Sequence, residues 1–339
     1  MAAPAHDGQL EDQYEDLLGL WSDLESALSA LLARPMQTQD FVAKVGQLDR
    51  WLQDLVAHDT DAALYLMFQL ASTSTVGYSA SHALVCGTLC HIVAQDLQLP
   101  APERDSLVHA ALTMNIAMTA LQDLLAGQRE RPSAAQQEAI RSHPREGQLL
   151  LSRLFVQDEL WLDVVGQHHA PLPEREPLAQ LPAADRLTRI LGTIDRYAAM
   201  ISPRKSREGR SATDSVRAIV GQEDTLREEV SYALVRAVGL CPPGTFVRLD
   251  NGDTAVVLRR SNKANQPLVA SILDAKGTPR PEPRLHQTSL GKPRVQSALA
   301  HGAVTAEANH RTMVRLGLYA ARHSQQQLRS MVTMPGTLH

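Results

Sequence analysis

The chain has 339 residues, of which 44% are hydrophobic and 21% charged, and its formal net charge is -4. This length predicts two or three folding units rather than one core, and the acidic balance argues against a partner that is a nucleic acid polymer. No stretch reaches the roughly 18 uninterrupted apolar residues that span a bilayer. The polar, acidic N-terminus is unlike a signal peptide. We therefore expect a cytoplasmic protein without a membrane span.

Residues 1–74 are predicted to form an N-terminal helical module, because apolar residues recur there at helical spacing. In the first helix they fall on one stripe: Trp21, Leu24, Leu28 and Leu31. The helices of this segment are expected at residues 9–33, 39–58 and 61–72. No arrangement of residues in it suggests chemistry.

Residues 75–240 are predicted to form a larger helical domain. Its helices are expected at residues 79–97, 103–125, 134–140, 157–169 and 184–201, with one or two more over 212–238. A turn at SHPREG is expected to separate the helix at 134–140 from a further one that ends near Leu154. The proline-rich stretch after the histidine pair at 168–169 and the basic stretch PRKSREGR are expected to be loops.

The pattern changes at residue 241. Residues 246–260 alternate apolar and polar side chains around Asn251-Gly252, which predicts a β-hairpin, and PLVASILD predicts a third strand. We therefore expect a small β segment at 241–290 and a C-terminal extension at 291–339 with one helix, near 303–323. Aromatic content is only 4%, and alanine and leucine abound, so the fold class is predicted to be mainly α.

Five candidate metal ligands lie in the helical domain in the order His82, His143, His168, His169 and Asp195. Imidazole nitrogens and carboxylate oxygens are common ligands of metal ions, and this set suffices for one ion. Adjacent residues of a helix point about 100° apart. We therefore expect His168 and His169 to serve different ions if they bind any.

The order and spacing of these residues resemble the HD-GYP family, helical bacterial domains of the HD superfamily that hydrolyse the second messenger cyclic di-GMP. The resemblance covers about residues 76–260. His82 resembles the family's first helix histidine, SHPREG its HPxxG motif, His168-His169 its HHE motif and TIDRYAAM its ADxYDAL motif. The resemblance implies an HD-superfamily helical bundle, with iron or manganese as the metal and the five candidate residues as its ligands.

The same resemblance places two basic residues of the family at Arg204 and Arg207. Guanidinium groups there could bind phosphate through charge-assisted hydrogen bonds. The alternative is that they belong to a solvated basic loop.

The chain departs from the family at the residues that perform the chemistry. Met114-Asn115 stands where the family has its His-Asp pair, Met118 replaces a lysine, Ala170 replaces the glutamate of HHE, and the GYP signature is missing. Tyr78 stands where metal-rich members have a glutamate. An asparagine cannot bridge two cations as a carboxylate does, and a thioether suits hard or borderline ions poorly. One ion is therefore expected rather than two.

The favoured interpretation is a degenerate signalling or regulatory protein with lost or weakened cyclic di-GMP phosphodiesterase activity, which binds cyclic di-GMP or signalling proteins. The first alternative is an active metal-dependent phosphodiesterase or phosphohydrolase with an altered, mononuclear site. The second is a helical interaction scaffold without ligand or metal, in which the histidines bond to each other. Cys86 and Cys90 are expected to be helix-packing residues, and His91 and His109 structural residues without partners.

Overall fold

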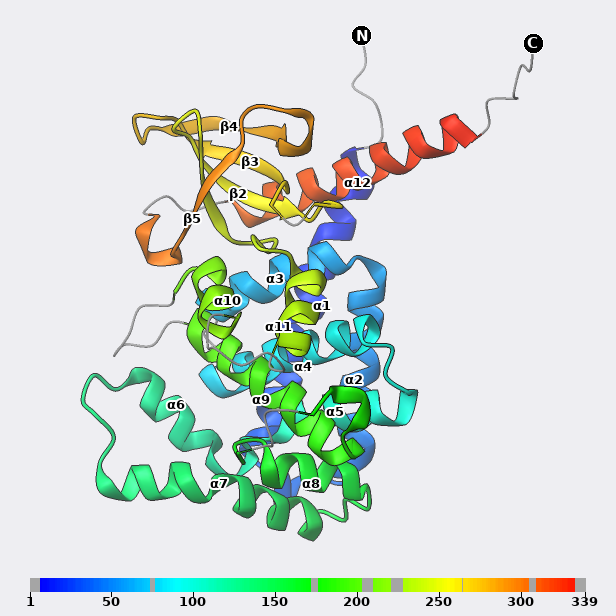
Figure 1. The fold of residues 1–339 in the computed structure, drawn as a ribbon, viewed down its shortest axis with the longest axis vertical. Helices are drawn as coiled ribbons and strands as arrows, with labels where there is room; N and C mark the ends of the chain where they lie inside the picture. The colour runs from blue at the N-terminus through cyan, green and yellow to red at the C-terminus, as the bar shows by residue number, and fades with distance from the viewer. Residues whose placement is uncertain are drawn as a thin grey trace.

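The computed structural model describes residues 7–73, 77–171, 176–202, 210–220, 228–263, 265–304 and 309–332. Figure 1 shows a helical body with a small sheet at one end. The helices of the described ranges are α1 (Asp7–Ala33), α2 (Phe41–His58), α3 (Thr60–Thr73), α4 (Tyr78–Asp96), α5 (Ala101–Thr113), α6 (Thr119–Gly127), α7 (Ala134–Arg153), α8 (Glu159–Gln167), α9 (Ala183–Ile201), α10 (Ala212–Val220), α11 (Glu228–Val238) and α12 (His310–Val332). The strands are β1 (Phe246–Leu249), β2 (Thr254–Arg259), β3 (Leu268–Leu273), β4 (Pro279–Gln287) and β5 (Val295–Leu299).

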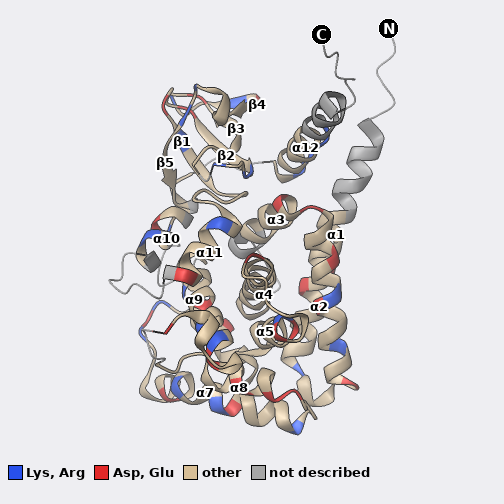
Figure 2. Ribbon diagram, turned by 45° about the vertical axis from the view of Figure 1, so that its right-hand side comes forward, with Lys and Arg blue, Asp and Glu red and all other residues tan. Residues whose placement is uncertain are grey.

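Helix α4 forms the centre of the helical body. Every residue from Ser79 to Ala94 is buried, because its sequence, SASHALVCGTLCHIVA, has small or apolar side chains on all sides and a helix of that kind is covered on every face. Helices α1, α3, α5, α9 and α11 contact it, and Figure 2 shows α4 nearly end-on with its neighbours around it. Polar side chains between Ser79 and Ala94, such as His82, are therefore buried in the core.

The β segment is an antiparallel sheet with strand order β4-β3-β2-β1-β5. Successive strand residues point to opposite faces. One face, with Phe246, Val256 and Ala270, joins the main hydrophobic core, whereas the other, with Val247 and Val257, belongs to a separate small cluster. The sheet thus packs on the helical body through one face.

One hydrophobic core runs through the described chain from Leu17 on α1 to Leu318 on α12. Helix α12 contacts α1, α3 and β2, so the last described helix packs against the first. The predicted fold class, mainly α with N-terminal helices and a small C-terminal β segment, is confirmed. The division into four segments stays a prediction. Among the described helices, none combines the length and apolar character needed to cross a membrane.

The C-terminal extension differs from its expected form. It contributes a strand, β5, which pairs with β1, and its helix begins at His310 rather than near 303. Strand β5 is short, and none of its side chains is fully buried. Its sequence lacks the apolar alternation that would indicate a strand.

Two expected helix boundaries in the middle of the chain are also wrong. The helix expected over 103–125 is interrupted: α5 ends at Thr113, a turn and a 3-10 helix (Ile116–Met118) follow, and α6 begins at Thr119. Asn115, at φ -100° and ψ 13°, lies outside the helical region. Conversely, no turn separates two helices at SHPREG, because α7 continues through Pro144.

Candidate metal centre

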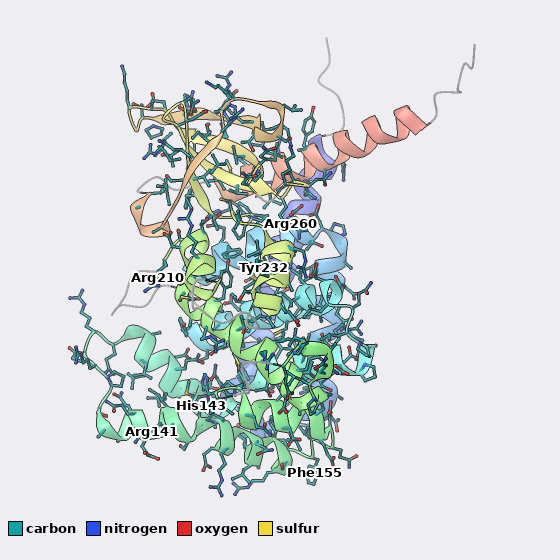
Figure 3. All side chains as sticks on the ribbon, in the orientation of Figure 1. Arg141, His143, Phe155, Arg210, Tyr232 and Arg260 are labelled. Atoms are coloured by element: carbon teal, nitrogen blue, oxygen red, sulfur yellow. The ribbon has the colours of Figure 1, made fainter. Side chains whose placement is uncertain are left out.

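The first candidate ligand, His143, lies on α7 directly before a proline, in the lower part of the body in Figure 3. Pro144 has no N–H, so the carbonyl of Ile140, four residues earlier, lacks its usual helical donor. The ring Nδ1 of His143 donates to that oxygen at 2.6 Å. A neutral imidazole carries one proton, so this bond leaves Nε2 as a bare acceptor. The proline, expected to mark a turn, therefore helps to fix the histidine ring.

His168 is held in the same way at the end of α8. Its Nδ1 donates to the carbonyl of Val165 at 2.8 Å, which again leaves Nε2 bare. Its main chain lies against α9, where a Cβ atom on Gly192 would stand 2.9 Å from the His168 carbonyl oxygen. Glycine at this position lets the end of α8 approach α9, the helix that also carries Asp195.

The two rings meet through their bare nitrogens. Nε2 of His143 and Nε2 of His168 are 3.1 Å apart, and the two residues are 1% and 3% exposed. Burial lowers the pKa of His143 and lowers the pKa of His168 to about 3, so neither ring takes a second proton near neutral pH. Two nitrogen ligands of one cation, with bonds of about 2.1 Å at right angles, lie about 3 Å apart. The pair is therefore placed to share an ion.

His169 completes this set, the three-histidine group (His143, His168 and His169). One nitrogen of each ring lies within 4.8 Å of the others. The helical geometry assumed for His168 and His169 is wrong, because α8 ends at Gln167 and the pair lies in a turn. Their rings therefore belong to one group, and their service to different ions stays a prediction. His169 is exposed, and through it the group reaches solvent.

A second set, the thiol group (His82, Cys86 and Asp195), lies on α4 and α9. Nε2 of His82 is 2.8 Å from Oδ1 of Asp195 and 3.6 Å from Sγ of Cys86. Burial raises the pKa of the Cys86 thiol well above its ordinary value, so the thiol is neutral. Nδ1 of His82 has no hydrogen-bond partner among the described residues. The arrangement is therefore best satisfied with the proton of His82 on Nε2, donated to Asp195.

Asp195 connects the two groups electrostatically. Its side chain is 14% exposed, and its charge acts on His143 and His168 in addition to its bond with His82. Burial alone raises the pKa of Asp195. The hydrogen bond from His82 and the electrostatic influence of His82, His168 and His169 together outweigh burial, and the net pKa lies well below the ordinary value. The five candidate ligands thus lie in two adjoining groups around an ionised carboxylate.

The residues at the family's His-Asp position lie in the turn between α5 and the 3-10 helix. Met114 is 1% exposed, and Asn115 is half-buried. Gly147 brings α7 close to this turn, since a Cβ there would stand 3.6 Å from the main-chain oxygen of Met114 and 3.2 Å from Val165. The turn therefore packs against the helix that carries His143, yet it supplies neither an imidazole nor a carboxylate.

Other candidate residues have mixed outcomes. Arg204 and Arg207 lie outside the described residues, and their role in phosphate binding stays a prediction. His91 and His109, expected to lack partners, both have one: His91 bonds to a glutamine one turn later, and His109 lies 3.3 Å from the carboxylate of Asp49. Both are thus accounted for as structural residues.

Cys86 is the site residue that sequence reasoning assigned only to packing. The available signal was its spacing, since residues four apart share one face of a helix and His82 precedes it by four. Tyr78, four residues before His82, stacks on the imidazole with ring centroids 5.6 Å apart. The face of α4 that carries His82 thus presents an aromatic ring on one side and a thiol on the other.

Comparison with known proteins gives one relative by sequence. It is named cyclic di-GMP phosphodiesterase PA4108, from Pseudomonas aeruginosa, and is 27% identical over 190 residues, which are 55% of this chain and 46% of the relative. The chain thus spans less than half the length of the curated relative that it matches. No family model matches. A solved structure described as an HDG"Y"P protein, Bd1817 from Bdellovibrio bacteriovorus, aligns with 68% of this chain and 73% of its own, at 15% identity and a TM-score of 0.49. By sequence, the chain is a distant relative of a cyclic di-GMP phosphodiesterase.

Proposed function

We propose that this chain is a degenerate HD-GYP-like regulatory protein that holds one metal ion in the three-histidine group and binds cyclic di-GMP beside it, with hydrolysis lost or weakened. The observation that supports this proposal is the pair of bare Nε2 atoms of His143 and His168, 3.1 Å apart. Each ring is fixed by a backbone carbonyl at Nδ1, as is usual for histidines that bind metals. The proposal includes a cytoplasmic location and signalling proteins as further partners.

The residues present fit a metal ion. Three imidazoles converge, two of them buried and neutral near pH 7, and neutral imidazole is the form that binds metals. We propose iron ahead of manganese, because nitrogen ligands favour iron and oxygen ligands favour manganese. When bound, the ion would supply a positive centre that attracts a phosphate oxygen. His143, His168 and His169 would hold it.

Loss of hydrolysis follows from the residues at the family's catalytic positions. Asn115 carries no charge to bridge metal ions, and Met118 offers no ammonium to stabilise a phosphate. The carboxylate that remains, Asp195, is already bonded to His82. Binding of an anionic nucleotide needs only positive charge and shape, so binding can outlast hydrolysis.

The main alternative is an active phosphodiesterase with one metal ion. It is favoured by Asp195, which stays ionised beside both groups and could orient an attacking water through a hydrogen bond. The second alternative, a scaffold without ligand, is compatible with the internal bonds of the thiol group.

The test uses the full chain, purified after expression with iron and manganese supplied. Metal content is measured together with calorimetric binding of cyclic di-GMP and chromatography of its products. We expect about one equivalent of metal, and nucleotide binding without significant turnover. Turnover at an enzymatic rate would replace this proposal by the first alternative, and a protein with neither metal nor nucleotide by the second.

Two variants make the test specific. His168→Ala should remove the metal, because it deletes one of the two facing nitrogens. His286→Ala is the matched control, since His286 lies on β4 and bonds to Ser271 there. Equal metal content in both variants would show that the three-histidine group is not the binding site.

A further inference from the structure

A cavity of about 580 Å³ lies where α3, α12 and the loops that follow β2 and β4 meet. Small organic ligands commonly bind in cavities of about 300–1,000 Å³. Nine of the twelve described residues that line it are polar or charged, so a ligand for it should be polar as well. None of the five candidate metal ligands is among these twelve. Figure 3 labels one lining residue, Arg260, between the sheet and the helical body.

Two arginines at the end of β2 are held in fixed orientations at this cavity. Nη1 of Arg259 donates to Asp59 at 2.8 Å, and Nε of Arg260 donates to Asp61 at 2.6 Å. Nη1 of Arg260 also donates to the carbonyl of Ala237. Nη2 of Arg260 has no hydrogen bond to the described residues, so its two N–H groups remain for a ligand. A guanidinium that is fixed in advance loses little freedom when it binds an anion.

The charges at the cavity do not balance. Three cationic side chains line it, those of Arg259, Arg260 and Lys263. Asp59 and Asp61 neutralise two of these charges through their bonds to the arginines. Lys263 is exposed, and its ammonium has no ion pair among the described residues. One positive charge is therefore left over, which favours an anionic ligand.

The amide and hydroxyl groups of the lining indicate what else the ligand carries. The side-chain oxygen of Gln266 is buried and has no donor among the described residues. A buried acceptor without a partner lowers stability, and a hydroxyl group of a ligand would supply the missing donor. Gln287 and Ser289, which bond to each other at 2.8 Å, add further polar groups to the wall. The lining thus suits an anion that also carries hydroxyl groups.

We propose that this cavity binds a hydroxylated organic phosphate, of the class of the sugar phosphates. A phosphate monoester carries a charge of about -1.5 to -2 near pH 7 and offers three acceptor oxygens. Nη2 of Arg260 and the ammonium of Lys263 would donate to these oxygens, and Gln266 would accept from a sugar hydroxyl. A carboxylate has less charge and fewer oxygens, so it would satisfy these donors less completely. The proposal does not depend on a metal ion in the three-histidine group.

Ribose 5-phosphate serves as the probe, because it combines a phosphate with hydroxyl groups. The full-length protein is kept metal-free with a chelator, so that no bound metal ion can attract the phosphate. Titration calorimetry compares ribose 5-phosphate with inorganic phosphate and with ribose. We expect ribose 5-phosphate to bind about 10-fold or more tightly than either, because only it meets both the cations and Gln266.

Two lysine variants locate the binding. Lys263→Glu should weaken binding of ribose 5-phosphate by about 10-fold or more, because it places a carboxylate beside the phosphate. Lys276→Glu is the matched control, since Lys276 is exposed in the turn between β3 and β4 and does not line the cavity. Both lysines are exposed, so neither change should disturb folding, and circular dichroism checks this. Equal affinities in the two variants would overturn the proposal, as would a wild-type protein that binds no ribose 5-phosphate at millimolar concentration.

Two further variants separate the parts of the proposal. Gln266→Leu should weaken binding of ribose 5-phosphate and leave the affinity for inorganic phosphate unchanged, because it removes only the acceptor for the hydroxyl group. An equal loss for both ligands would contradict the role given to Gln266. His168→Ala should leave binding of ribose 5-phosphate unchanged, because His168 belongs to the three-histidine group. Loss of binding in that variant would assign the phosphate to the three-histidine group instead of this cavity.

Discussion

The two histidine groups use the same kind of ring and differ in what lies behind it. In the three-histidine group, Nδ1 of His143 and Nδ1 of His168 donate to carbonyls of their own helices, and the opposite nitrogens face each other. In the thiol group, His82 bonds forward to Asp195, and its Nδ1 has no partner among the described residues. The first group presents two bare nitrogens to a cation, whereas the facing nitrogen of the second is already engaged by a carboxylate.

This difference shows why a list of histidines is a weak guide to a metal site. Whether a ring can bind depends on which nitrogen carries the proton, and a neighbouring carbonyl or carboxylate decides that. His143 owes its orientation to Pro144, which leaves the Ile140 carbonyl free to accept. The histidines therefore differ in how readily they could bind a metal ion, although the sequence marks all of them as candidate ligands.

The largest effect, on the rate of hydrolysis, is expected from placing a His-Asp pair at positions 114 and 115. Met114→His together with Asn115→Asp would return an imidazole and a carboxylate to the turn that packs against α7. If their loss explains weak hydrolysis, the double variant should cleave cyclic di-GMP on the order of 100-fold faster than the unmodified chain, the scale of one well-placed charged group. Chromatography of the products measures this.

Single variants serve as controls for that experiment. Met114→His alone adds a nitrogen ligand without the bridging charge and should gain little. A double variant that folds and binds metal but hydrolyses no faster would show that the residues at 114 and 115 do not limit hydrolysis.

The sequence predicted the helical architecture well, because apolar spacing depends only on local periodicity and survives in helices such as α1 and α9. The prediction of helix boundaries was wrong where they depend on a contact of one particular side chain or turn rather than on apolar spacing. Periodicity does not reveal the turn at Met114-Asn115, since the apolar spacing continues across it. Nor could it show that α7 passes through Pro144, because the compensating bond comes from the side chain of His143.

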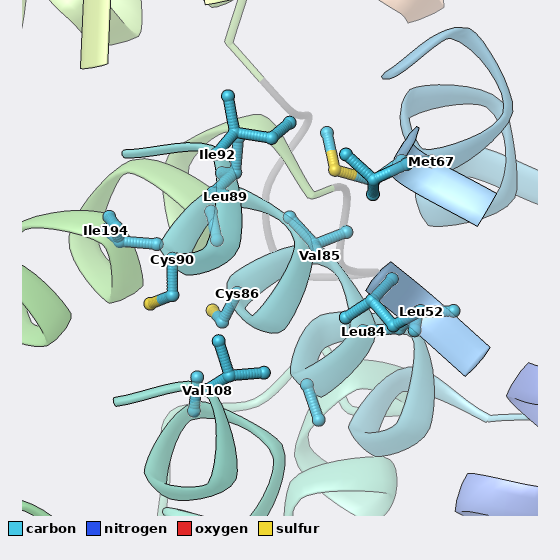
Figure 4. Packing of buried hydrophobic residues seen from close by; sticks show 14 of the residues in the cluster. Leu52, Met67, Leu84, Val85, Cys86, Leu89, Cys90, Ile92, Val108 and Ile194 are labelled. Atoms are coloured by element: carbon cyan, nitrogen blue, oxygen red, sulfur yellow. The ribbon is translucent and has the colours of Figure 1, made fainter. Parts of the chain in front are cut away.

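At the candidate site, sequence reasoning found every histidine and the carboxylate but not their division into two groups. That division arises from the packing of α4, α7, α8 and α9, which only the fold determines. From sequence alone, Cys86 is expected to be a packing residue, because a cysteine on an apolar helix is ordinarily one. Figure 4 shows Cys86 and Cys90 on neighbouring turns of α4 among apolar side chains, which is the setting that this expectation assumes.

Pro144→Ala should change stability and metal binding in opposite directions. It returns an N–H donor to the Ile140 carbonyl and removes a proline from a helix interior, which should raise the unfolding free energy by about 1–3 kcal/mol. The new donor competes with Nδ1 of His143, so metal affinity should fall by up to about 10-fold. Urea unfolding and metal titration of the same sample test both halves, and increases in both would contradict the proposed role of the proline.

A smaller effect is expected at Gly192. In Gly192→Ala the new methyl group would stand 2.9 Å from a backbone oxygen, that of His168, which cannot rotate away. After the gain of about 1 kcal/mol in helix propensity, a net loss of about 1–2 kcal/mol should remain, with weaker metal binding. Gly166→Ala is the matched control, because the atoms nearest to its methyl group would be the end of the Gln148 side chain, which can rotate away. Similar thermal stability of the two variants would argue against close packing of α8 on α9 here.

The smallest effect concerns pH and the metal-free protein, kept so with a chelator. The pKa of His168 falls from 6.5 to about 3 on folding, so below pH 6.5 the unfolded chain binds a proton that the folded chain does not. The unfolding free energy should therefore decline as pH falls from 6.5 toward 3, by up to about 1.4 kcal/mol per pH unit for this residue. His168→Gln should flatten the decline between pH 6.5 and 5 more than His286→Gln does, because His286 is less buried although its pKa is also lowered. Equal slopes of unfolding free energy against pH in the two variants would mean that burial does not keep His168 neutral. The proposal that its Nε2 is bare and ready to bind a metal ion would then lose support.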